Sequence, residues 1–86
     1  MPRLSAFYGI VIAMYFREHG RPHFHAVYAE HEATIAIDTL EVLAGSVPDR
    51  ALRLTREWAE MHRNELEANW SRARDFQELQ PIALLA

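Results

Sequence analysis

The sequence predicts an α+β domain, in which a four-stranded, mainly antiparallel meander is followed by a helical region packed on one face of the sheet. Two observations predict this class. Apolar residues recur at about every second position through the first half of the chain, the period of a strand. After Gly45 the period becomes about 3.6 residues, the period of a helix. A chain of 86 residues has room for one two-layer core, so we expect a single domain over residues 1–86.

The strands are expected at about residues 7–16, 23–29, 32–38 and 40–44. The first of them is apolar on both faces, which predicts a position inside the sheet. The next segment contains Gly20 and Pro22, and proline cannot donate a hydrogen bond within a central strand, so this segment is expected to be the turn before the second strand. Gly45 is expected to end the fourth strand.

The helical region is expected at about residues 48–74. Pro48 fits the first turn of a helix, where a missing N–H costs little. The pattern allows either one continuous helix or two helices that meet near residues 62–64. Trp58 and Trp70 fall on the apolar stripe and are expected to be core aromatics. The apolar tail, residues 81–86, is a candidate edge strand.

Strand alternation predicts where the histidines of the second strand point. If the second and third strands form a hairpin, Phe24 must share the core face with Ile35, so His23 and His25 lie on the opposite face. A two-residue turn at residues 30–31 would pair His23 with Asp38, and a register shifted by two residues satisfies the same core matching. We expect this histidine face to be accessible.

The same matching places Tyr15 and Arg17 of the first strand on the histidine side. Two histidines separated by one residue on a strand can both reach one metal ion, a zinc-like divalent ion bound by nitrogen and oxygen. The expected third ligand is Asp38, with His19 and His31 as alternatives. The chain has no cysteine, so a thiolate site is excluded.

Two other interpretations of the histidine face remain open. In the first, His23 and His25 are catalytic without a metal: one takes a proton, while the other and Arg17 or Arg21 stabilise an anion such as phosphate. Tyr15 on the same face completes the candidate catalytic set. In the second, the histidines only pack and form hydrogen bonds at the base of the turn. The spacing of the residues does not separate these alternatives.

Charge and hydropathy exclude several classes of function. The net charge of −3 and the pI of about 5.9 argue against a non-specific nucleic-acid binder, which needs a basic surface. The three glycines are too scattered to form a phosphate-binding loop. The chain shows no signal-peptide pattern or membrane-length apolar segment, so we expect a cytoplasmic protein.

The chain also resembles small bacterial proteins of the family called domain of unknown function 4160 (DUF4160). The matching features, in chain order, are Pro2, Phe7, Gly9-Ile10, Ile12, Met14-Tyr15-Phe16, Glu18-His19, Pro22-His23-Phe24-His25, Tyr28, Leu40-Glu41-Val42, Gly45, Ala51-Leu52-Arg53-Leu54, Glu57-Trp58-Ala59-Glu60, His62-Arg63, Glu65-Leu66 and Asn69-Trp70. Such proteins are often encoded beside a small protein of the family called domain of unknown function 2442 (DUF2442).

The resemblance implies a component of a two-gene, toxin–antitoxin-like module that acts through a small protein partner and is itself toxin-like. Two alternatives stand beside it. One is a histidine-dependent or metal-assisted phosphodiester hydrolase, with nucleic acid only as a substrate, and the other is a purely structural adaptor. A homo-oligomer is compatible with all three.

Overall fold

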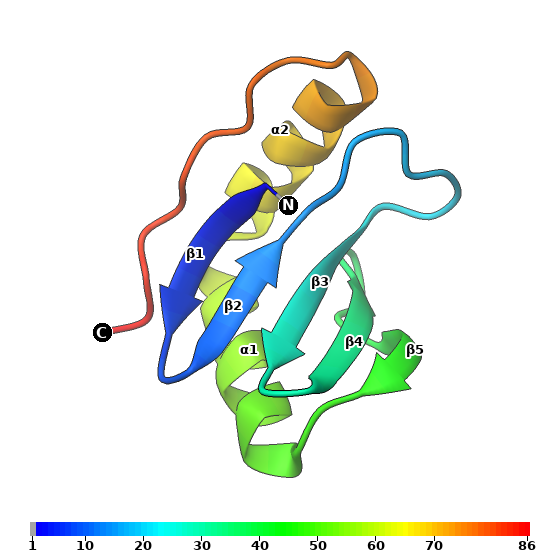
Figure 1. Cartoon of the computed structure of the whole chain (residues 1–86). Coiled ribbons are helices and arrows are strands. Elements are labelled where there is room, and N and C mark those ends of the chain that lie inside the picture. The colour runs from blue at the N-terminus through cyan, green and yellow to red at the C-terminus, as the bar shows by residue number, and fades with distance from the viewer. Residues whose placement is uncertain (1) are drawn as a thin grey trace.

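The computed structural model describes residues 2–86 and confirms the α+β class (Figure 1). One five-stranded antiparallel sheet has the strand order β1-β2-β3-β4-β5 and is followed by two helices, so the predicted meander is confirmed with one strand more than expected. The elements are β1 (Arg3–Phe7), β2 (Ile10–Ala13), β3 (His23–Tyr28), β4 (His31–Ala36), β5 (Val42–Ser46), α1 (Asp49–Met61) and α2 (Arg63–Arg74). Within residues 2–86, no helix is long and apolar enough to span a membrane.

The additional strand, β1, lies almost entirely before the strand predicted over residues 7–16, and β2 occupies only residues 10–13 of that predicted range. The chain reverses at Tyr8 and Gly9, which both have positive φ angles of 50° and 80°, and this two-residue turn joins β1 to β2. Two successive positive φ angles are typical of the tight turn that suits the twist of a hairpin. The prediction was wrong here because Tyr8 continues an apolar run and does not resemble a turn residue. The predicted interior position holds for β2, which lies between β1 and β3.

The β3–β4 hairpin has the register shifted by two residues from the tight turn considered above. His23 pairs with Ala36 and His25 with Thr34, because the turn falls at residues 29–30, where Ala29 has a φ of 52°. A shift of two residues leaves every side chain on the same face, so core matching could not separate the two registers. Asp38 consequently lies beyond the end of β4.

Gly45 lies inside β5, so the prediction that it ends the strand was wrong. Its φ is +71°, and a Cβ atom at this position would lie 2.2 Å from the carbonyl oxygen of Glu32 on β4. Only glycine allows the two backbones to approach this closely at that angle. The glycine thus maintains the pairing of β4 with β5 instead of terminating it.

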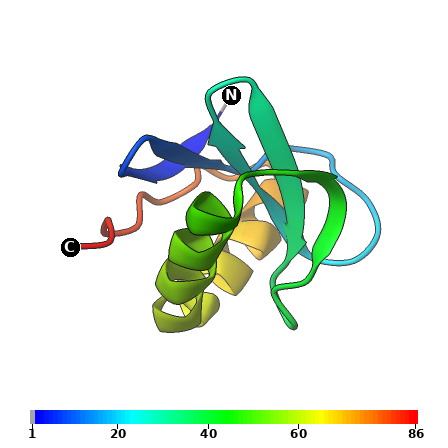
Figure 2. The ribbon, with the colours of Figure 1, turned by 90° about the horizontal axis from the view of Figure 1, so that it is seen from below.

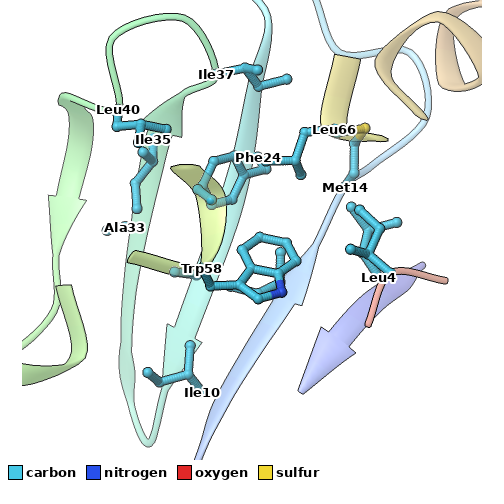
Figure 3. Packing of buried hydrophobic residues seen from close by; sticks show 14 of the residues in the cluster. Leu4, Ile10, Met14, Phe24, Ala33, Ile35, Ile37, Leu40, Trp58 and Leu66 are labelled. Atoms are coloured by element: carbon cyan, nitrogen blue, oxygen red, sulfur yellow. The ribbon is translucent and has the colours of Figure 1, made fainter. Parts of the chain in front are cut away.

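Both helices cover the same face of the sheet (Figure 2). Phe24 from β3 and Leu66 from α2 converge on Trp58 from α1, and all three side chains are fully buried (Figure 3). The ring centroid of Trp58 lies 6.1 Å from that of Phe24 and 5.5 Å from that of Phe7. The predicted packing of a helical region on one sheet face is therefore what the structure has.

The helical region consists of two helices, one of the two alternatives that the sequence allowed. The break is at His62, which has a φ of −124° and donates its backbone N–H to the carbonyl of Ala59. The side chain of His62 bonds Glu65 through Nδ1 at 2.5 Å, in the first turn of α2.

The C-terminal tail packs beside β1 without forming a strand (Figure 1). The backbone N–H of Ile82 donates to the carbonyl of Leu4 at 2.8 Å, and the indole N–H of Trp58 donates to the carbonyl of Ala83 at 2.8 Å. Asn69 accepts from the N–H of Gln80 and donates to its carbonyl, each at 2.9 Å. These contacts connect the tail to both layers of the fold.

Candidate functional site

The loop that joins β2 to β3, residues 14–22, brings a carboxylate to the two histidines of β3. Arg17 and Gly20 have positive φ angles of 65° and 88°, which turn the loop back toward the sheet. Glu18 offers a carboxylate oxygen, and His23 and His25 each offer a ring nitrogen; these three atoms all lie within 4.8 Å of one another. We call these three residues the Glu18 cluster.

His25 is held by carboxylates at both ring nitrogens. Its Nε2 lies 2.5 Å from Oε1 of Glu18, and its Nδ1 lies 3.1 Å from Oε2 of Glu32 on β4. The hydroxyl of Thr34 is also 3.4 Å from Nδ1, and the Tyr15 ring centroid is 4.4 Å from that of His25. The ring is therefore fixed in position and orientation.

His23 is oriented by the backbone of the preceding loop. Its Nδ1 lies 2.7 Å from the carbonyl oxygen of Arg21, which can only accept, so Nδ1 carries the hydrogen. Its Nε2 lies 3.3 Å from the same Glu18 oxygen that contacts His25. The ring also contacts Trp70 of α2, with a centroid separation of 4.9 Å, so His23 joins the cluster to the helical layer.

Both imidazoles are buried, which corrects the expectation of an accessible histidine face. His23 and His25 are each 8% exposed, while the side chain of Glu18 remains 28% exposed. The histidines alternate with Phe24, as predicted, and do not belong to the hydrophobic core cluster. Strand alternation identified the face of the two histidines correctly, but it contains no information on how the loop of residues 14–22, which precedes β3, folds over that face.

The electrostatics of the cluster favour an ionised Glu18. Burial raises the pKa of this carboxyl group, but the hydrogen bonds and charges of His25 and His23 lower it more, so the pKa lies below its ordinary value. The pKa of the nearby Tyr15 phenol is raised, first by burial and then by the negative charges of Glu32 and Glu18. Tyr15 therefore remains a neutral hydrogen-bonding group beside the cluster.

A pocket of about 520 Å³ adjoins the cluster and shares Glu18 with it. Its other lining residues are Arg17, His19, Gly20, Trp70, Arg74 and Phe76. The guanidinium carbon of Arg17 lies 5.2 Å from the centroid of the Phe76 ring, within the range of a cation–π contact. Two guanidinium groups and two aromatic rings thus surround a space that is next to the histidines.

The structure brings together only some of the residues predicted for this site. His25 contacts both Tyr15 and His23, whereas Arg17 lines the adjoining pocket. Asp38, expected as a metal ligand, instead pairs with Arg21 at 3.0 Å.

Arg21 also pairs with Glu41, at 2.9 Å. The hydrogen bond from Arg21 is the main reason that the pKa of the Asp38 carboxyl lies below its ordinary value. Asp38 is 61% exposed and forms no part of the Glu18 cluster. The arginine thus has a structural role on the surface, and its carbonyl orients His23.

Sequence reasoning missed two acidic residues, Glu18 and Glu32. Glu32 lies on the same face of the β3–β4 hairpin as His25 once the true register is known. Glu18 is the acidic residue nearest in sequence to the two histidines. The turn at Gly20 lies between Glu18 and β3, so it can direct the Glu18 carboxylate back toward the histidines of that strand. The spacing Glu-x4-His-x-His was therefore the available signal.

The structure and sequence were compared with known proteins. A family model described as Domain of unknown function (DUF4160) matches residues 9–71, which include Glu18, His23, His25 and Trp70 and end before Arg74. Searches of curated proteins and of solved structures give no match.

Proposed function

We propose that the chain is the toxin-like component of a two-gene module and that it hydrolyses phosphodiester bonds at the Glu18 cluster. The premise is that the chain belongs to the DUF4160 family. One observation carries the proposal: a carboxylate and two imidazoles converge within 4.8 Å beside a pocket that two arginines line. The family match covers the cluster but specifies no reaction.

The side chains around the pocket suit a nucleotide. Arg17 and Arg74 provide guanidinium groups for phosphate oxygens, opposed by the single carboxylate of Glu18. Trp70 and Phe76 provide aromatic rings for a base. The small number of basic residues fits recognition of one phosphate group better than coverage of a long nucleic-acid backbone.

The Glu18 cluster contains the groups that such a hydrolysis requires. Water adds its oxygen to phosphorus, the bond to the leaving oxygen breaks, and the proton lost by water ends on the leaving oxygen. His23 and His25 are oriented through Nδ1, so their Nε2 atoms face Glu18 and the reaction site. Preorganised polar groups of this kind are the usual source of rate enhancement in a partly buried site.

Growth and RNA integrity after induced expression test this function. Expression of the wild-type chain should arrest growth with cleavage of cellular RNA, and the double variant His23→Ala, His25→Ala should abolish both effects. His31→Ala is the matched control, because His31 is an exposed histidine outside the cluster. Circular dichroism of the purified variants excludes unfolding as the cause, and arrest that persists in a folded double variant contradicts the proposal.

Arg74→Ala tests the pocket separately from the chemistry. If Arg74 binds the phosphate of the substrate, this variant should raise KM for a short oligonucleotide more than it lowers kcat. Arg50→Ala is a suitable control, since Arg50 is exposed at the start of α1 and does not line the pocket. An unchanged KM in Arg74→Ala would show that Arg74 does not bind the phosphate of the substrate.

The protein partner of the module is proposed to bind the edge strand β5. Four of its five residues are exposed, and Leu43, which the irregular β4–β5 pairing leaves without a partner in the ladder, is 39% exposed. The opposite edge, β1, instead accepts a hydrogen bond from the tail. An uncovered edge offers backbone groups to an added strand.

Co-expression with the neighbouring small protein of the DUF2442 type should therefore give a stoichiometric complex and relieve growth arrest. Leu43→Asp should weaken that complex at least about 10-fold if β5 is the interface, because a buried unpaired charge is costly. Tyr8→Asp is the control, since Tyr8 is exposed at the β1–β2 turn. A complex that forms without growth arrest or RNA cleavage would favour a structural adaptor.

A further inference from the structure

We propose that the Glu18 cluster is a divalent-cation site of zinc type, in which Glu18, His23 and His25 are the three protein ligands. The inference rests on the proposed function, since it names the cofactor of the same site. It differs from the sequence-based expectation, in which Asp38 was the third ligand. Asp38 is paired with Arg21, and Glu18 takes its place.

The contacts at Nδ1 of the two histidines carry the argument. The Arg21 carbonyl accepts a hydrogen bond from Nδ1 of His23, and the Glu32 carboxylate lies 3.1 Å from Nδ1 of His25. Each Nε2 faces the Glu18 carboxylate, and the contact from His25 is a hydrogen bond that shares one proton. Once that proton leaves, three electron-pair donors face one another, an arrangement that a shared cation stabilises.

A divalent ion satisfies all three donors at once, whereas one proton links only two of them. Histidine ligands of zinc characteristically donate their other N–H to a carboxylate or a backbone carbonyl, and the cluster contains one example of each. Two histidines and one glutamate form a known type of three-ligand set for catalytic zinc. The absence of cysteine is consistent with such a nitrogen and oxygen site.

The distances are also compatible with an ion. Ligands about 2.0–2.2 Å from a tetrahedral ion are separated from one another by about 3.3–3.6 Å. The separation of His23 Nε2 from Glu18 Oε1 is already 3.3 Å. The separation of His25 Nε2 from the same oxygen is 2.5 Å, so this contact must open by about 1 Å when the ion replaces the shared proton.

The position of the site fits a catalytic ion better than a purely structural one. Three protein ligands leave a tetrahedral position for water or substrate, and Glu18 also lines the pocket that contains Arg17 and Arg74. A bound cation would polarise a phosphoryl oxygen and acidify a water molecule. The two buried imidazoles hold the ion while the partly exposed carboxylate connects it to the pocket.

Zinc titration of the untagged protein tests the inference. Protein dialysed against a chelator should bind one zinc ion per chain by calorimetry, and cobalt in its place should give the visible absorption of a tetrahedral complex. Glu18→Gln and His25→Ala should each weaken zinc binding by about 100-fold or more, and Glu32→Ala by about 10-fold to 100-fold through loss of the support at Nδ1. His31→Ala and Glu30→Ala, both at exposed positions outside the cluster, should bind as the wild type does.

The outcomes separate this inference from the proposed function. Failure of the folded wild-type chain to bind zinc overturns the inference, and so does binding that Glu18→Gln and His25→Ala leave unchanged. RNA cleavage that persists in metal-free protein with chelator present supports the hydrolase and overturns the role of the ion as its cofactor. Stoichiometric zinc binding that the ligand variants abolish, in a protein without hydrolytic activity, supports the metal site and contradicts the hydrolase.

Discussion

Replacement of Gly45 by alanine is expected to destabilise the protein for two reasons that can be measured apart. The first is the backbone conformation, because a left-handed φ costs an L-residue about 1–2 kcal/mol. The second is the approach of β4, since the new Cβ would lie 2.2 Å from the Glu32 carbonyl oxygen. Displacement of packed backbone to relieve such an overlap costs about 1–3 kcal/mol, for a total of about 2–5 kcal/mol.

Gly20→Ala is a control for the cost of the left-handed backbone conformation. Its φ is +88°, but a Cβ atom there would meet nothing within 4 Å. Gly20→Ala should therefore lower the free energy of unfolding only by the conformational cost of about 1–2 kcal/mol. The difference between the two alanine variants isolates the contact between β5 and β4.

Urea unfolding followed by the fluorescence of Trp58 and Trp70, both buried, measures these free energies. The whole domain is expected to be stable by about 4–13 kcal/mol, so Gly45→Ala removes a large part of that stability. Thermal unfolding should give a melting temperature at least about 4 °C lower for Gly45→Ala than for Gly20→Ala. Equal stability of the two variants would show that β4 and β5 do not approach as closely as described.

Three further predictions concern the core, the tail and the surface. Leu66→Ala, at a fully buried position, should lower the free energy of unfolding by about 2–5 kcal/mol in the same assay, and a loss below about 1 kcal/mol would contradict its place in the core. Trp58→Phe removes the hydrogen bond to Ala83, so the tail should become more susceptible to limited proteolysis, and unchanged protection would refute this anchor. Arg21 lowers the pKa of Asp38 in the folded protein, so the ion pair stabilises the fold above the pKa that Asp38 has in the unfolded chain. This stabilisation is lost as the pH falls through the lower folded-state pKa. Arg21→Ala should raise the pKa of Asp38 in an NMR titration, and an unchanged pKa would exclude the ion pair.

The fold class followed from the sequence because hydrophobic period distinguishes strands from helices. The period of two predicted the second and third strands within a few residues, and the change of period after Gly45 predicted the helical region. The period did not reveal the turn at Tyr8 and Gly9, because Tyr8 continues the apolar run; the turn shifts the alternation by one position, so that Phe7 pairs with Ile10. The predicted strand therefore extended across the turn, and β1 before it was not predicted.

The candidate site was predictable to the extent that it depends on strand alternation. His23 and His25 share a face because strand alternation determines it, whereas Tyr15 reaches His25 from the loop after β2, which ends at Ala13. Glu18 lies in a loop whose path depends on the left-handed residues Arg17 and Gly20, and hydrophobic period has no bearing on that path. The third member of the cluster, and the burial that it produces, therefore required the structure.

The three members of the Glu18 cluster lie in one continuous segment, residues 18–25. Closing a short loop costs little conformational entropy, so the carboxylate and the two imidazoles can meet as soon as β2 and β3 pair. A residue inserted between Glu18 and His23 would disconnect the carboxylate from both rings, whereas insertions at the β1–β2 or β3–β4 turns would leave all three groups in place. The segment is not sufficient by itself, because Glu32 of β4 and Trp70 of α2 contact the two rings, so a graft onto another antiparallel hairpin would need both supports.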